Sequence, residues 1–132
     1  MPTSPTQRSL QYARKSGYVA GVVERWAPLS IKQPDGTFKM IPYGKRHDLF
    51  GCIDIVCLDD LHTGIIGIQA TSRTNHNARL AKSKGCEELA VWLRCGGKFE
   101  VWSWAKQGAA GKRKLWNCKR QEITLTDMEA TS

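Results

Sequence analysis

The sequence predicts an α/β protein with a mixed central β-sheet flanked by helices. Apolar, β-branched runs recur between turn residues along the chain, which indicates strands at residues 18–26, 51–58, 64–71 and 98–105. A stretch of helical periodicity separates the third run from the fourth. A helix of that length can cross back over a sheet, so we expect an α/β sandwich.

The chain is expected to open with a helix and a strand. Residues 5–16 should form a short helix that places Leu10 and Ala13 inward and ends at Gly17. Residues 18–26, YVAGVVERW, are apolar enough for the first strand.

A basic hairpin should follow, as an insertion over about residues 28–46. The turn signal Pro34-Asp35-Gly36 lies between two alternating segments, which predicts a protruding hairpin. Its basic residues are Lys32, Lys39, Lys45 and Arg46. They would suit a clamp on a phosphate backbone, and a solvated loop is the alternative.

The next two strands carry polar residues in unusual places. Asp54 interrupts the apolar run of residues 51–58, and a buried acid costs several kcal/mol unless a cation or a hydrogen-bond partner neutralises it. The short turn 59–63 favours a hairpin with residues 64–71, where alternation puts Gln69 and Thr71 on one face. The right register would bring these residues beside Asp54, which is the geometry of a divalent-metal site.

A long helix should run from Thr74 or Asn75 to about Arg94 and end at Gly96-Gly97. The apolar positions expected to face the sheet are Ala78, Ala81, Leu89, Ala90, Trp92 and Leu93. Strand 98–105, KFEVWSWA, then alternates between two faces. A basic loop at 106–113, a last strand at about 115–125 and a flexible polar tail at about 126–132 complete a single domain spanning residues 1–132.

The charge favours a polyanionic partner. The chain has 20 Lys and Arg against 12 Asp and Glu, for a net charge of +8, and nucleic acid is the commonest such partner. No apolar run approaches the ~20 residues needed to span a bilayer, and the N-terminus lacks the apolar core of a signal peptide. We therefore expect a cytoplasmic protein, in the nucleoid or a phage-infected cell, with its five cysteines reduced.

The order helix, three strands, helix and two strands resembles the PD-(D/E)XK nuclease superfamily. Within it, the chain is most similar to archaeal-type Holliday junction resolvases and related small phage and bacterial nucleases. The matching segments are GYVAGVVERW, CIDIV and GIIGIQATS. The resemblance implies an αβββαββ restriction-endonuclease-like core and a phosphodiesterase that depends on Mg²⁺ (or Mn²⁺). The family aspartate falls on Asp54, the second acid on Gln69 and the lysine on Thr71.

Gln69 and Thr71 depart from that family pattern, so other residues must compensate. A Gln oxygen can bind Mg²⁺ without adding negative charge, and Glu24 or Asp48 could complete the metal site. Lys82, Arg79 or Arg73 could replace the missing lysine. In the competing interpretation, Asp54 is a structural acid paired with Arg46 or Arg73.

The predicted function is a metal-dependent DNA endonuclease, selective for junctions or other branched DNA. The alternative is a degraded nuclease domain that binds nucleic acid or a DNA-processing partner without cleaving it. The candidate catalytic residues are Asp54, Gln69, Thr71, Glu24 and Lys82. The candidate DNA-binding residues are Lys32, Lys39, Lys45, Arg46, Arg73, Arg79, Lys112 and Arg113. Resolvase-like relatives are generally dimers, which implies a possible homodimer, and residues 99–104 could form either its interface or the core.

Overall fold

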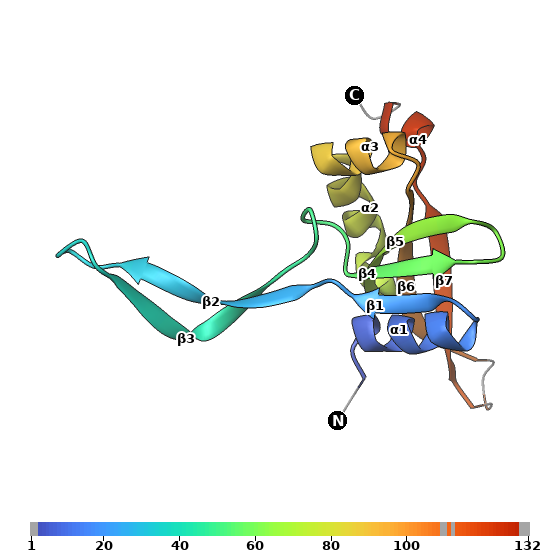
Figure 1. Cartoon of the computed structure of the whole chain (residues 1–132). Helices are drawn as coiled ribbons and strands as arrows, with labels where there is room; N and C mark the ends of the chain where they lie inside the picture. Colours follow the sequence, from blue (N-terminus) through green and yellow to red (C-terminus); the bar gives the residue numbers. More distant parts are fainter. Residues whose placement is uncertain (1–2, 109–110, 112, 130–132) are drawn as a thin grey trace.

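The computed structural model describes residues 3–108, 111 and 113–129, without the side chains of residues 26–31 and 40–46. A five-stranded sheet has the order β1-β4-β5-β6-β7, and β2 and β3 form a separate two-stranded sheet (Figure 1). The five strands are β1 (Val19–Val22), β4 (Ile55–Asp59), β5 (Gly64–Ser72), β6 (Lys98–Gln107) and β7 (Leu115–Glu122). Among the strand pairs of the described residues, β5 and β6 alone are parallel, so the predicted mixed sheet of an α/β protein is confirmed.

Helices cover both faces of the sheet. Helix α1 (Pro5–Lys15) buries Leu10 and Ala13, as predicted, in a cluster with Ile68 and Trp102. Its first turn is capped by Ser4, whose hydroxyl accepts a hydrogen bond from the backbone N–H of the residue at position 7. A second cluster on the other face joins the helices that follow β5 to the alternate side chains of β6.

The prediction of a single long helix between β5 and β6 is wrong. The segment comprises a 3₁₀ turn η1 (Arg73–Asn75), α2 (His76–Lys84) and α3 (Glu87–Arg94). Buried Leu80 and Leu89 are nine residues apart, so at about 100° per residue they would lie on opposite sides of one straight helix. The break lets both leucines pack on the sheet, whereas Ala78 and Ala81, expected to face it, are exposed.

Strand β6 lies inside the sheet, paired with β5 on one side and β7 on the other. Trp102 and Trp104 are buried on one face, and Phe99 and Val101 pack in the cluster on the opposite face. Residues 99–104 therefore belong to the core of the monomer and leave no surface there for a dimer interface.

The predicted basic hairpin is present and projects from the body of the protein (Figure 1). It consists of β2 (Arg25–Lys32) and β3 (Phe38–His47), which pair antiparallel. Gly36 takes a φ of 89° in the turn, a conformation that glycine adopts without strain. The strand expected at 18–26 is thus split, since the chain leaves the main sheet after Val22 and enters the hairpin.

Two boundaries near the other strands also differ from expectation. The strand predicted from residue 51 begins only at Ile55, because residues 49–53 form a tight turn that leaves Asp54 directly before β4. The tail contains helix α4 (Leu125–Glu129), while residues 130–132 lie outside the described part of the chain. Thr124 and Asp127 exchange hydrogen bonds as a capping box, a helix-start signal that the sequence analysis missed.

All five cysteines are free thiols, consistent with the expectation of reduced cysteines. None of the described helices has the length and apolar character that crossing a membrane requires.

Candidate metal centre

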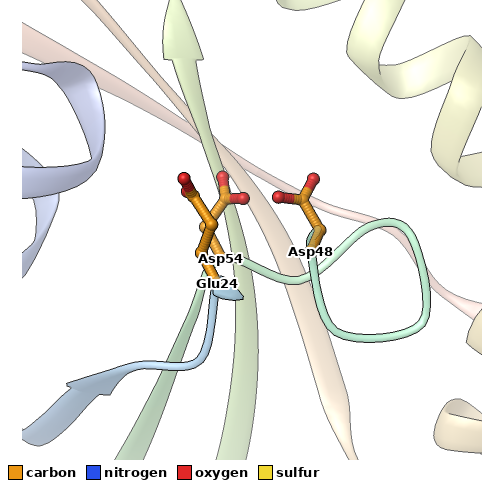
Figure 2. A group of neighbouring side chains, drawn as sticks. All are labelled: Glu24, Asp48 and Asp54. Atoms are coloured by element: carbon orange, nitrogen blue, oxygen red, sulfur yellow. The ribbon is translucent and has the colours of Figure 1, made fainter. Parts of the chain in front are cut away.

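Three carboxylates converge where the hairpin joins the main sheet. Glu24, Asp48 and Asp54 each offer an oxygen, and these oxygens all lie within 4.8 Å of one another. Figure 2 shows the three side chains pointing toward a common space. Glu24 directly precedes β2, Asp48 directly follows β3 and Asp54 directly precedes β4, so both predicted alternatives for completing the site are present.

The backbone fixes these three positions. The carbonyl oxygen of Asp54 accepts hydrogen bonds from the N–H groups of Val23 and Glu24, at 2.9 and 3.3 Å. Leu49 and Ile53 exchange backbone hydrogen bonds of 2.8 and 3.0 Å, which closes the turn between Asp48 and Asp54. Backbone contacts therefore hold the acids together against their mutual repulsion.

Asp54 is the most buried of the three acids, with 3% of its surface exposed. Its Oδ2 accepts hydrogen bonds from Gln69 Nε2 at 2.7 Å and from the backbone N–H of Ala70 at 2.8 Å. Burial raises the pKa of Asp54 to about 8, and hydrogen bonding to Asp48 adds to the rise, whereas the Ala70 N–H opposes it. Without a cation, the cluster therefore keeps a proton at neutral pH.

Gln69 is buried beside the cluster, as the predicted strand pairing requires. Its amide nitrogen donates a hydrogen bond to Asp54, but its Oε1 has no hydrogen-bond partner among the described residues. Together with the three carboxylates, this amide oxygen would make up an all-oxygen donor set, the kind of ligand set that hard divalent cations such as Mg²⁺ prefer. These residues fit a divalent metal ion.

The acids and Gln69 line a cavity of about 300 Å³. Helix α2 contributes Arg79 and Lys82 to the same cavity, and the remaining lining residues are Thr6 and Ala70. Carboxylates and basic side chains thus share one space, which suits a cation and a phosphate together. Nothing in the sequence marked Thr6, at the start of α1, as part of this site.

Thr71 and Arg73 lie apart from this cavity. Thr71 is buried next to Ser103 in the register of β5 and β6 and is not among the residues that line the cavity. The Arg73 guanidinium donates to Ser103 Oγ at 3.1 Å and to Asn117 Oδ1 at 3.0 Å. These bonds hold the Arg73 side chain against β6 and β7, so Arg73 does not form the predicted ion pair with Asp54.

A buried histidine completes this second polar group. His76 Nδ1 lies 2.6 Å from Ser103 Oγ, and its Nε2 lies 2.9 Å from Gln121 Oε1. The sequence predicted no role for His76, which the fold buries to 3% exposure at the start of α2. Ser103, a hydroxyl in an apolar strand, was the only sequence signal of this polar group.

The predicted DNA-binding residues fall in separate regions. Lys32 and Lys39 are exposed at the far end of the hairpin, and Arg113 is exposed in the loop between β6 and β7. The side chains of Lys45 and Arg46, and all of Lys112, lie outside the described residues. Among the predicted residues whose side chains are described, Arg79 alone, with Lys82, borders the acidic cluster.

Comparisons of the chain with protein-family models, curated proteins and solved structures give no match. The functional argument therefore rests on the chemistry of the site itself.

Proposed function

We propose that this chain is a Mg²⁺- or Mn²⁺-dependent DNA endonuclease of the PD-(D/E)XK type. The observation that carries the proposal is the cavity that three carboxylates and Gln69 line together with two basic side chains. This combination suits metal-dependent cleavage of a phosphodiester, because the acids can hold the cation while the basic side chains offset the repulsion between those acids and the negative phosphate.

Each residue has a distinct role in this proposal. Asp54, Asp48 and Glu24 would hold the divalent ion, with Gln69 Oε1 as a neutral ligand. The ion supplies polarisation of the scissile phosphate and a lower pKa for a bound water. Lys82 neutralises charge that develops on the phosphate, in place of the lysine that the family carries where Thr71 stands.

The order of elements supports the nuclease core. Without the hairpin, the chain runs α1, β1, β4, β5, a helical segment, β6 and β7, which is the αβββαββ order of the family. The predicted aspartate and Gln69 lie on neighbouring segments, joined by a hydrogen bond.

DNA is the proposed substrate because the net charge of +8 favours a polyanion, and branched or junction DNA is the proposed preference. A symmetric junction needs two cuts, so this preference goes with a homodimer. The proposed location is the cytoplasm, where such DNA would be met.

A second candidate is a domain that binds DNA without cutting it. It is favoured by Gln69, whose amide donates to Asp54 as a structural hydrogen bond would, and by Thr71, which does not line the cavity. In this case Asp54 would stay protonated and the cluster would hold no metal.

A cleavage assay separates the two candidates. Purified protein is incubated with linear, single-stranded, flap and four-way-junction DNA in Mg²⁺, Mn²⁺ or EDTA. We expect metal-dependent cleavage that Asp54→Asn abolishes, while DNA binding is retained because the protonated Asp54 of the metal-free protein and its Asn replacement are both neutral. Asp60→Asn, which changes an exposed acid in the β4–β5 turn, is the matched control. If no DNA is cleaved and calorimetry shows no heat of metal binding, the endonuclease proposal fails and the DNA-binding candidate remains.

A further inference from the structure

The β2–β3 hairpin begins and ends at the acidic cluster. Arg25 and His47 form its first residue pair, directly after Glu24 and directly before Asp48. From this root the hairpin extends away from the main sheet as a two-stranded ribbon (Figure 1). A ligand that lies along the full length of the ribbon therefore reaches the three carboxylates at its root.

We infer that this ribbon lies in the major groove of B-form duplex DNA and places a phosphate at the acidic cavity. The inference rests on the proposed function, which places cleavage at the acidic cavity. The substrate would then be DNA that is double-stranded on the side of the cut next to the ribbon. Four properties of the ribbon support it, namely its charge, the placement of its cations, its width and its length.

The ribbon is strongly basic. Residues 25–47 include five Lys or Arg, and Asp35 is the only acid. The Asp35 carboxylate is engaged in the turn, where it accepts hydrogen bonds from the backbone N–H and the hydroxyl of Thr37. The positive charge, at the root of the ribbon in residues 25, 45 and 46 and near its tip in residues 32 and 39, therefore attracts phosphate at both ends of the ribbon.

The two described lysines lie on opposite faces of the ribbon. Lys32 pairs with Phe38, and Lys39 pairs with the preceding position, residue 31. Directly opposed residues share a face and successive residues alternate, so Lys32 and Lys39 point to opposite sides. Cations on both faces suit a ribbon between two phosphate backbones better than one that lies flat on a single backbone.

The width of the ribbon selects the kind of groove. The major groove of B-DNA, about 12 Å wide, admits a two-stranded β-ribbon without deformation, whereas the minor groove of about 6 Å takes one only when the DNA is bent or the groove is widened. The major groove of an RNA duplex is deep and narrow, which excludes the same insertion. The ribbon should therefore favour duplex DNA over both duplex RNA and single strands.

The length of the ribbon sets the length of duplex. The eight residues of β2, at about 3.3 Å each, span about 26 Å. At about 3.4 Å per base pair, this corresponds to roughly eight base pairs from the cluster to the ribbon tip.

Binding in EDTA tests the inference without cleavage. Fluorescence anisotropy would compare DNA duplexes of 6, 12 and 20 base pairs, single strands and a 20-base-pair RNA duplex. In one variant, residues 31–39 are replaced by Asn-Gly, which joins the paired positions Ser30 and Met40 through a two-residue turn. The second variant is Lys32→Ala with Lys39→Ala, and its matched control removes two exposed cations elsewhere, Arg94→Ala with Lys98→Ala.

We expect the shortened ribbon to weaken binding of the 20-base-pair DNA at least tenfold but binding of the 6-base-pair DNA little. The double substitution of Lys32 and Lys39 should reduce the steepness of log affinity against log salt concentration by about two, since each phosphate contact contributes about 0.9. The control double substitution should leave this slope unchanged. Equal binding of the 20-base-pair DNA by wild-type and shortened proteins would overturn the inference, as would equal affinity for duplex RNA. If the shortened protein does not fold, the salt slope of the double-lysine variant decides.

Cleavage in Mg²⁺ or Mn²⁺ keeps this inference separate from the proposed function. If the protein cleaves DNA but its binding does not depend on the ribbon, the inference about the ribbon is refuted and the endonuclease proposal stands. Ribbon-dependent binding of duplex DNA without any cleavage supports the inference and refutes the endonuclease proposal.

Discussion

Asp54→Asn should stabilise the metal-free protein at alkaline pH. The carboxyl group is buried beside Asp48 and Glu24, and its pKa is raised from 3.8 to about 8. In the folded protein it therefore keeps a proton between about pH 4 and pH 8, where the unfolded chain has released it. The folded state binds more protons in this window, so the free energy of unfolding falls as pH rises.

The structure gives the size of this effect. At about 1.4 kcal/mol per pH unit, the change in pKa corresponds to a loss of at most about 6 kcal/mol in the free energy of unfolding. Asp48 shares the same proton, so a single substitution should remove only part of this, on the order of 2–3 kcal/mol at pH 8. Asparagine keeps an oxygen to accept from Gln69 Nε2 and the Ala70 N–H, and its amide can donate to Asp48, so the fold should be retained.

Urea unfolding in EDTA at pH 5, 6, 7 and 8 measures the difference. We expect wild-type stability to fall across this range, and the stability of Asp54→Asn to change much less. Mg²⁺ at pH 8 should restore wild-type stability but have little effect on the variant, because the ion replaces the proton. Asp60→Asn, at an exposed position, should follow the wild type. A wild-type curve that is flat or rises from pH 5 to 8 would refute the reasoning.

Three further predictions concern single positions. Gln69→Glu should bind Mg²⁺ more tightly in calorimetry yet unfold more easily in EDTA, because it buries another carboxylate; metal heat no larger than wild type would argue against the Gln69 oxygen as a ligand. Gly67→Ala should lose about 1–3 kcal/mol in urea unfolding, since the new Cβ would lie 2.7 Å from Ile53 Cδ1, whereas Gly21→Ala, with no atom within 4 Å, should not. Lys82→Ala should slow cleavage at saturating DNA at least about tenfold while Lys82→Arg keeps most of the activity, and equal rates for the two would remove Lys82 from the reaction.

The sequence by itself determined the α/β class, the protruding hairpin and the pairing of the segments that carry Asp54 and Gln69. These features depend on local signals: apolar runs of strand length, a Pro-Asp-Gly turn, and an acid in a run otherwise suited to burial. Alternation along a strand is a geometric property of the backbone, so the shared face of Phe99 and Val101 also followed from the sequence.

Only the tertiary structure decided where the helical segment breaks and which acids meet. Local periodicity cannot show that Leu80 and Leu89 must both reach one sheet, which requires the break between α2 and α3. Glu24 and Asp48 are 24 positions apart in the chain, and they meet because the hairpin returns the backbone to its own root. Convergence of this kind depends on strand pairing over a long separation, which no short stretch of sequence encodes.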